Sequence, residues 1–267
     1  MSTIDGIRLK IEWAKQHVKN LDGVIRVFRN SRPYEVIGQE NYQTTELEWV
    51  LTRAREIPAD VPLIAGDAIQ NLRSALDYLA CSLVVANGRK PIEGVTAFPI
   101  SDSLPKHQAA MRGGKVEGMS QPAIAAIDAL RPYQGGRVTL WRLARMSNID
   151  KHRLLLSAAS AVISQTLLAK HRKQLLETYL GSYPNATELP DLGGTVIKPD
   201  NARFPLKVGE VFLSLPRAEM ENNFTFSLGV AFIEPSCGLV GDSILDVMTN
   251  FVACVEKIVS DFRGFLN

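Results

Sequence analysis

The N-terminal residues carry the feature that most constrains the fold, a run of apolar positions spaced three and four apart. This spacing places the whole run on one stripe of an α-helix about seven turns long. Such a stripe must be covered by other apolar surface, so residues 1–30 are expected to form the first helix of a helical bundle core. The stripe consists of Ile4, Ile7, Ile11, Ala14, Val18, Leu21, Ile25 and Phe28.

Three further segments show helical spacing and extend this expected core. Gly66 and Asp67 are expected near the start of the first, because a carboxylate suits the N-terminal end of the helix dipole. Asp242 or Ser243 is expected to cap the last, since short polar side chains bond the free backbone N–H groups there. In the middle segment, Thr139 is expected to cap a helix that runs to about residue 161. The three segments are about 65–88, 120–165 and 242–266.

Two segments favour β-strands because apolar and polar residues alternate along them. They cover about residues 34–56 and 209–234. Helices and strands do not alternate as βαβ units, which argues against a doubly wound sheet. The sequence therefore predicts a single α+β domain over residues 1–267, mainly a helical bundle packed against a small antiparallel β-sheet. Residues 88–121 are rich in Gly and Pro and are expected to form a long surface connection of the kind that often carries function.

The composition fits a globular chain with a core of its own. The 267 residues are 46% hydrophobic and 22% charged, which excludes a disordered or collagen-like chain. No apolar run reaches the length of a membrane span, and the N-terminus lacks a secretion signal, so no membrane partner and a cytoplasmic location are expected. The three cysteines, Cys81, Cys237 and Cys254, lie far apart and are expected to be reduced core thiols.

Several common sites are missing from the sequence. There is no Gly-x-Gly-x-x-Gly, and the run from Gly113 to Val116 lacks the remaining residues of a phosphate-binding P-loop. The four histidines never form a His-x-x-x-His pair, so no metal site is expected. No cofactor is expected either.

The candidate catalytic residues are Arg145, Asn148 and His152. Their spacing of three and four places a cation, an amide and an imidazole on one stripe of the expected helix from Thr139. A guanidinium holds phosphate well, and imidazole moves protons near neutral pH. Equally, these side chains could satisfy buried polar groups and have a purely structural role.

A second polar cluster supports the first. Asn71, Arg73 and Asp77 flank the leucines of the segment 65–88, with Arg73 and Asp77 spaced as an ion pair. This flank is either a surface ion pair or a support that packs against the turn containing Asp150 and Lys151. Nothing in the sequence decides between these two interpretations.

The charge distribution favours an anionic partner. Nine Lys or Arg residues and one acidic residue lie between Arg131 and Lys173. Such a basic segment fits RNA or another phosphate-rich ligand, and it also fits a solvated basic surface.

The blocks NLRSALDYLA, which begins at Asn71, and NIDKHR, which begins at Asn148, resemble those of a family of uncharacterised bacterial proteins. More loosely, the chain is similar to the HEPN superfamily of helical bundles, many of which are metal-independent ribonucleases of toxin and phage-defence systems. Their Arg-x₄₋₆-His motif resembles Arg145 and His152, although Met146 replaces the usual polar residue after the arginine.

The HEPN resemblance implies an endoribonuclease in which His152 moves the proton of the RNA 2′-hydroxyl. Arg145 would then stabilise the scissile phosphate, and Asn148 would position one or the other. The resemblance also implies a homodimer, for which the stripe of residues 1–30 could serve unless it belongs to the core. The alternative is a non-catalytic helical binding or scaffold protein whose Asn, Asp, Arg and His network is structural.

Overall fold

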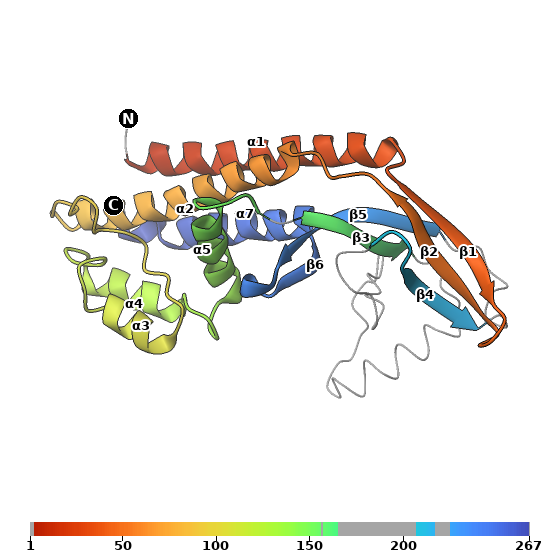
Figure 1. Cartoon of the computed structure of the whole chain (residues 1–267). Helices are drawn as coiled ribbons and strands as arrows, with labels where there is room; N and C mark the ends of the chain where they lie inside the picture. Colours follow the sequence, from red (N-terminus) through yellow and green to blue (C-terminus); the bar gives the residue numbers. More distant parts are fainter. Residues whose placement is uncertain (1–2, 156, 165–206, 217–224, 267) are drawn as a thin grey trace, which may run out of the picture. The chain divides into compact units, whose positions relative to one another are not determined.

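Helices make up most of the regular structure, so the chain belongs to the α+β class, as predicted (Figure 1). The structure is a computed structural model that describes residues 3–155, 157–164, 207–216 and 225–266. It divides into two compact units. The first comprises Met1–Val24, Ala59–Leu156 and Glu234–Asn267, and the second comprises Ile25–Pro58 and Ser157–Ile233. The single domain expected over residues 1–267 stays a prediction.

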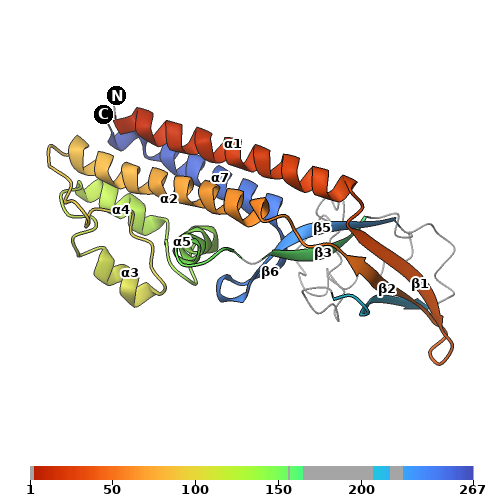
Figure 2. The same ribbon diagram turned by 45° about the horizontal axis from the view of Figure 1, so that its top comes forward.

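The long helices of the first unit lie side by side. Figures 1 and 2 show α2 (Asp60–Ala86) and α7 (Ile244–Asp261) running along the N-terminal part of α1 (Thr3–Asn30). The helix α5 (Val138–Asp150) packs against both α2 and α7. None of the described helices is both long and apolar enough to cross a membrane.

The apolar stripe of α1 belongs to the core. Within the first unit its buried members are Ile7, Ile11, Ala14 and Leu21. Because these side chains are already covered within the chain, they are not free to form the dimer interface that the sequence left open.

The helix α2 begins at Asp60, six residues before the predicted start at Gly66. Pro62 lies in its first turn, where the backbone N–H that proline lacks has no partner in the helix anyway. Pro62 is therefore compatible with a helix that begins before Gly66. At the other end, Asn87 caps the helix and Gly88 has a φ of +70°, a conformation that favours glycine.

Two short helices lie between α2 and α5. The first, α3 (Leu104–Ala110), interrupts the connection that was expected to be irregular. The second, α4 (Gln121–Ala129), begins where the Ser120 side chain accepts a hydrogen bond from the backbone N–H of Ala123.

The predicted helix from Thr139 to about residue 161 is wrong at both ends. Arg137 is the N-cap, and α5 ends at Asp150. Residues 157–164 instead form the strand β3 (Ser157–Ser164), whose backbone pairs with the strand β5 (Thr225–Glu234). This distant pairing overrides the local helical preference of the segment. The part of the prediction that covers residue 165 lies outside the described residues.

Before α7 the chain forms the short helix η2 (Pro235–Cys237) and the strand β6 (Leu239–Ser243). The Ser243 side chain then caps α7 by accepting a hydrogen bond from the backbone N–H of Asp246, as predicted. A short helix, η3 (Arg263–Phe265), follows.

The second unit contains the antiparallel strands predicted from alternation. The strands β1 (Tyr34–Asn41), β2 (Glu46–Ala54) and β4 (Val211–Pro216) form one sheet in that order. β5 (Thr225–Glu234) pairs antiparallel with β3, with Ser157 opposite Phe232 and Ser164 opposite Thr225. The predicted ranges 34–56 and 209–234 are thus confirmed as strand-bearing where the structure describes them.

Candidate functional site

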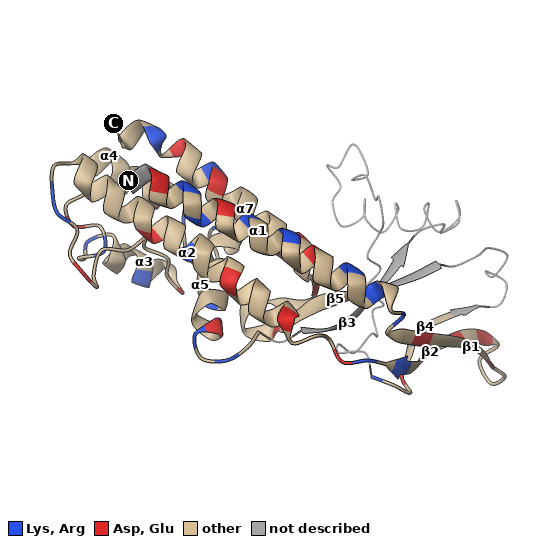
Figure 3. Cartoon of the chain, turned by 90° about the horizontal axis from the view of Figure 1, so that it is seen from above, with Lys and Arg blue, Asp and Glu red and all other residues tan. Residues whose placement is uncertain are grey.

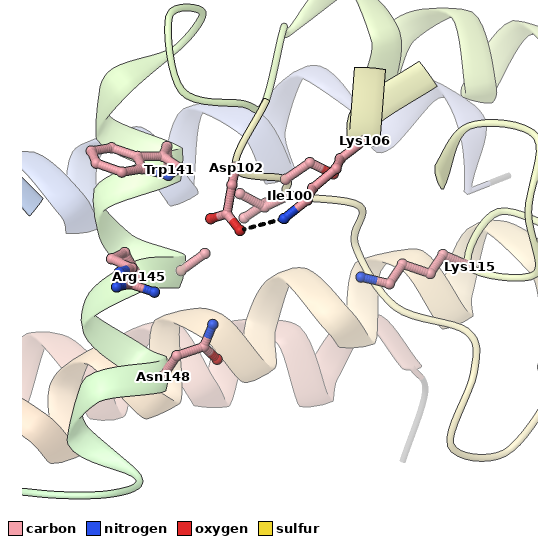
Figure 4. A pocket seen from close by; sticks show the side chains of 9 residues that line it. Ile100, Asp102, Lys106, Lys115, Trp141, Arg145 and Asn148 are labelled. Carbon is pink, nitrogen blue, oxygen red and sulfur yellow. Dashed lines mark hydrogen bonds and ion pairs between the residues drawn. The ribbon is translucent and has the colours of Figure 1, made fainter. Parts of the chain in front are cut away.

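A pocket of about 230 Å³ opens in the first unit between α5 and the connection that follows α2. Figure 4 shows that α5 forms one wall and that the segment around α3 forms the opposite wall. The lining residues are Ile100, Ser101, Asp102, Lys106, Lys115, Trp141, Ala144, Arg145 and Asn148.

Cations outnumber carboxylates in this pocket. Lys106, Lys115 and Arg145 contribute positive charge, and Asp102 is the one acidic residue of the lining. The Lys106 Nζ lies 3.3 Å from the Asp102 Oδ2, so this pair neutralises itself. The net positive charge therefore comes from Lys115 and Arg145.

Three lining side chains have hydrogen-bonding capacity to spare. Arg145, Asn148 and Lys115 are exposed, and their side chains make no hydrogen bond or ion pair with any residue that the structure describes. In Figure 4 the Lys115 and Asn148 side chains point toward the centre of the pocket. Guanidinium, ammonium and amide groups all donate hydrogen bonds, so the pocket offers donors to an acceptor-rich ligand.

Trp141 forms one end of the pocket. Its side chain is only 9% exposed, and its indole nitrogen is buried without a hydrogen-bond partner among the described residues. Figure 4 shows this nitrogen on the side of the ring that faces Asp102. A buried donor without a partner is uncommon and costs free energy.

The α5 wall is held in place by hydrogen bonds on its far sides. Arg142 donates to the backbone oxygens of Cys237 and Gly238 at 3.0 and 2.8 Å. Ser147 donates to Gln70 of α2, whose amide donates back to the Ser147 carbonyl. These contacts fix the rotation of α5 and therefore the direction in which Trp141 and Arg145 project.

The opposite wall is attached to α2 through Phe98. The Asp77 carboxylate accepts a hydrogen bond from the Phe98 backbone N–H at 2.9 Å, and Arg73 donates to the Phe98 carbonyl at 2.9 Å. Arg73 and Asp77 also form an ion pair of 2.9 Å, with exposed side-chain fractions of 16% and 34%. Burial lowers the pKa of Arg73, and the charge of Asp77 partly offsets this effect. The pair thus anchors the segment that enters the pocket two residues later at Ile100.

A buried histidine positions α3. His107 is fully buried, and its Nε2 lies 2.8 Å from the Asp128 Oδ1 of α4. Its ring also contacts Tyr133, with 5.2 Å between ring centroids. Lys106, the neighbour of His107 in sequence, is thereby held at the pocket.

The structure brings Arg145 and Asn148 together in the pocket but does not place His152 there. His152 is exposed in the turn that follows α5, so the predicted stripe of three residues on one helix is wrong. Lys151 is exposed in the same turn. Asp150 accepts a hydrogen bond from Gln70 at 3.1 Å, which is a contact between helices.

Of the two interpretations of the Asn71, Arg73 and Asp77 cluster, the structure shows the ion pair between Arg73 and Asp77 and no contact of Asp77 with the α5 turn. Asp77 binds Phe98, as described, and Asn71 accepts a hydrogen bond from Lys10 of α1 at 3.1 Å. The contact between α2 and the end of α5 exists, but Gln70 and Gly66 make it, and Gly66 lies directly against the Asp150 carboxylate.

Arg153 fixes the chain where it leaves α5. Its guanidinium donates to both carboxylate oxygens of Glu234, at 3.0 and 2.8 Å. Glu234 is fully buried, whereas the Arg153 side chain is 46% exposed. The hydrogen bond to Glu234 raises the pKa of Arg153. The backbone N–H groups of His152 and Arg153 both donate to the Ile149 carbonyl, and the ion pair attaches the end of this turn to Glu234.

Several cations of the basic segment have partners within the protein. Arg142 and Arg153 are bound within the protein, and Arg137 contacts the thiol of Cys254. Figure 3 shows basic and acidic residues interspersed along α1 and α7. Of the segment, Lys170, Arg172 and Lys173 lie outside the described residues.

Sequence reasoning missed Lys106, Lys115 and Asp102 as site residues. The available signal was the unusual length of the connection over residues 88–121, since long connections often carry function. Lys115 follows Gly113 and Gly114, and this run was not assigned to a site because it lacks the remaining residues of a P-loop.

Cys237 and Cys254 are buried free thiols, and Cys81 is partly exposed and free, in agreement with the prediction. Among the described residues, no cluster of three or more His, Cys, Asp or Glu side chains is placed to hold a metal ion. No family model, no curated protein and no solved structure matches this chain. The similarity to the HEPN superfamily therefore stays a prediction.

Proposed function

We propose that the pocket between α5 and the α3 segment binds the phosphate group of a ligand. The observation that carries the proposal is that Arg145, Lys115 and Asn148 line one pocket and that their side chains donate to no described residue. A phosphate group accepts several hydrogen bonds at once and carries the opposite charge, so it satisfies all three donors.

The chemistry of the donors favours phosphate over a simple halide or a neutral ligand. A guanidinium binds two phosphate oxygens in parallel, and a lysine adds a mobile point charge. Both groups are exposed in the free protein, so each reaches an incoming anion without a costly rearrangement.

The size of the pocket limits what it encloses. At about 230 Å³ it is smaller than the roughly 300–1,000 Å³ of sites for drug-sized ligands. It therefore accommodates a phosphate group and its immediate neighbours, while the rest of a larger molecule lies outside.

RNA cleavage is the narrower form of this proposal. It requires a proton-transferring group close to Arg145, and the imidazole that the HEPN resemblance implies is that of His152. Because His152 does not line the pocket, binding without cleavage is the form that the geometry favours. This form agrees with the alternative of a binding protein in which part of the polar network is structural.

The proposal is tested by calorimetric titration of the protein with inorganic phosphate at low ionic strength. Arg145→Ala is expected to weaken binding at least roughly tenfold, since one charge-assisted hydrogen bond contributes about 1.5–3 kcal/mol. Lys115→Ala is expected to weaken binding by a similar or smaller factor. Arg112→Ala and Lys90→Ala, which remove exposed cations outside the pocket lining, serve as matched controls.

Equal affinity in the wild type and Arg145→Ala would overturn the proposal. A second arm incubates end-labelled single-stranded RNA and tRNA with the protein in EDTA. Cleavage that is lost in both Arg145→Ala and His152→Ala would establish the ribonuclease form. No cleavage together with Arg145-dependent phosphate binding would establish the binding form.

A further inference from the structure

We propose that the pocket binds a sugar phosphate, and that Trp141 and Asp102 form hydrogen bonds with a hydroxyl group beside the phosphate. This inference rests on the proposed function, because it takes the phosphate as held by Arg145 and Lys115. It adds the chemical class of the ligand.

The indole of Trp141 supplies the first half of the argument. Its nitrogen is a donor only, it is buried, and no described residue accepts its hydrogen. A ligand atom that accepts this hydrogen removes the cost of a buried unpaired donor, so the interaction favours the bound state. The ligand must therefore present an acceptor at the Trp141 end.

Asp102 supplies the second half. A carboxylate accepts hydrogen bonds and has none to donate. Its Oδ2 is paired with Lys106, whereas its Oδ1 bonds to no residue that the structure describes. The ligand must therefore also present a donor near Trp141.

A hydroxyl group meets both requirements with one atom, because it accepts from the indole nitrogen and donates to the carboxylate. Both residues line the pocket, and Figure 4 draws the Trp141 nitrogen on the side of the ring toward Asp102. A phosphate dianion, a carboxylate or a halide cannot play this role, since none of them has a hydrogen to donate to Asp102.

The spacing along α5 fits a sugar that carries its own phosphate. Trp141 and Arg145 are four residues apart on the helix, which places their Cβ atoms about 6 Å apart on the same face. The Asp102 and Lys106 side chains are 60% and 69% exposed, and an exposed ion pair of this kind adjusts readily to a ligand.

The test compares ribose 5-phosphate with methyl phosphate, a phosphate monoester without a hydroxyl group. Calorimetry on the wild type, Trp141→Phe and Asp102→Ala gives the dissociation constants. In both variants, ribose 5-phosphate is expected to bind roughly three- to tenfold more weakly, as expected for one hydrogen bond. Methyl phosphate is expected to bind Trp141→Phe as it binds the wild type. Trp13→Phe, at an exposed position on α1, is the matched control, and thermal melts verify that each variant folds.

The outcomes separate the two proposals. If Arg145→Ala weakens methyl phosphate binding while Trp141→Phe leaves both ligands unchanged, the phosphate site stands and the hydroxyl recognition is overturned. If Arg145→Ala has no effect on either ligand, the proposed function itself fails.

The same phosphate and hydroxyl groups occur free or at the end of an RNA chain. A short single-stranded RNA with a 5′-phosphate distinguishes the two sources. Binding weaker than that of ribose 5-phosphate assigns the pocket to the free sugar phosphate. Tighter binding that Trp141→Phe also weakens assigns it to the RNA terminus.

Discussion

Asp77 of α2 accepts a hydrogen bond of 2.9 Å from the backbone N–H of Phe98, two residues before the first lining residue of the pocket. Together with the bond from Arg73 to the Phe98 carbonyl, it fixes both polar groups of one residue. The interaction connects a core helix to a wall of the candidate site. Residues that looked like a surface ion pair thus have a structural role close to the pocket.

Asp77→Ala is expected to lower the free energy of unfolding by about 2 kcal/mol. The substitution leaves the largely buried Arg73 without its ion-pair partner and the Phe98 N–H without an acceptor. Urea denaturation measures the loss. Asp67→Ala, at an exposed position on the same helix, is expected to change stability by less than about 0.5 kcal/mol. Equal effects of the two variants would contradict the anchoring role of Asp77.

Gly66→Ala and Gly23→Ala are expected to have opposite effects. A methyl group at Gly66 would collide with the Asp150 carboxylate, whereas at Gly23 it meets nothing within 4 Å. Alanine in a helix is otherwise better than glycine by about 0.5–1 kcal/mol. Gly23→Ala should therefore stabilise the protein, and Gly66→Ala should destabilise it by about 1–3 kcal/mol. Thermal melts of the two variants measure these effects. Stabilisation by Gly66→Ala would show that α2 and α5 do not lie in direct contact at Gly66 and Asp150.

Arg153→Ala is expected to lower the free energy of unfolding by about 2–3 kcal/mol, because it removes the bidentate partner of the buried Glu234. Because much of the Arg153 side chain is exposed, the expected loss of free energy of unfolding is smaller than for a fully buried ion pair. Arg145→Ala, which removes a pocket cation without a described partner, should change stability by less than about 0.5 kcal/mol. Chemical denaturation of both variants measures the difference, and a reversed order would refute the assigned roles.

Tyr34 is expected to make stability fall at high pH. Burial raises the pKa of Tyr34 from its ordinary value of 10 to about 12, so the unfolded chain loses this proton first. Its contribution is therefore full below pH 10 and declines by up to about 2 kcal/mol as the pH rises toward 12. Denaturation midpoints at pH 9 and 11 should differ less in Tyr34→Phe than in the wild type. In Tyr42→Phe, which changes an 87% exposed side chain, the difference should match that of the wild type.

Local patterns predicted the elements whose neighbours lie close in sequence. The stripe of α1 follows from spacing alone, because burial imposes the helical period. The Ser243 cap likewise depends on a side chain and a backbone N–H three residues apart. These features could be predicted because the interactions that define them are local or periodic.

Distant contacts decided what the sequence did not predict. Residues 157–164 have no strong strand pattern, and they form β3 because β5 pairs with them from about 70 residues away. The ion pair between Arg153 and Glu234, 81 residues apart, likewise joins segments that are distant in the sequence.

Only part of the candidate site could be predicted from the sequence, for the same reason. Arg145 and Asn148 lie on the same face of one helix, so their spacing in the sequence was enough to predict that they lie together. Lys106 and Lys115 reach the pocket only because Asp128 holds His107 and Asp77 holds Phe98. These contacts join separate segments of the chain, and spacing carries no information about them.

The most direct test of the phosphate site is a titration of isotopically labelled protein with methyl phosphate, followed by NMR of the side-chain N–H signals. The account predicts that the Arg145 Nε–H and the Asn148 amide signals shift with one common dissociation constant and reach saturation. The signals of Arg112, outside the pocket lining, should stay in place. Weak shifts spread over many exposed arginines without saturation, and none larger at Arg145, would contradict a phosphate site in this pocket.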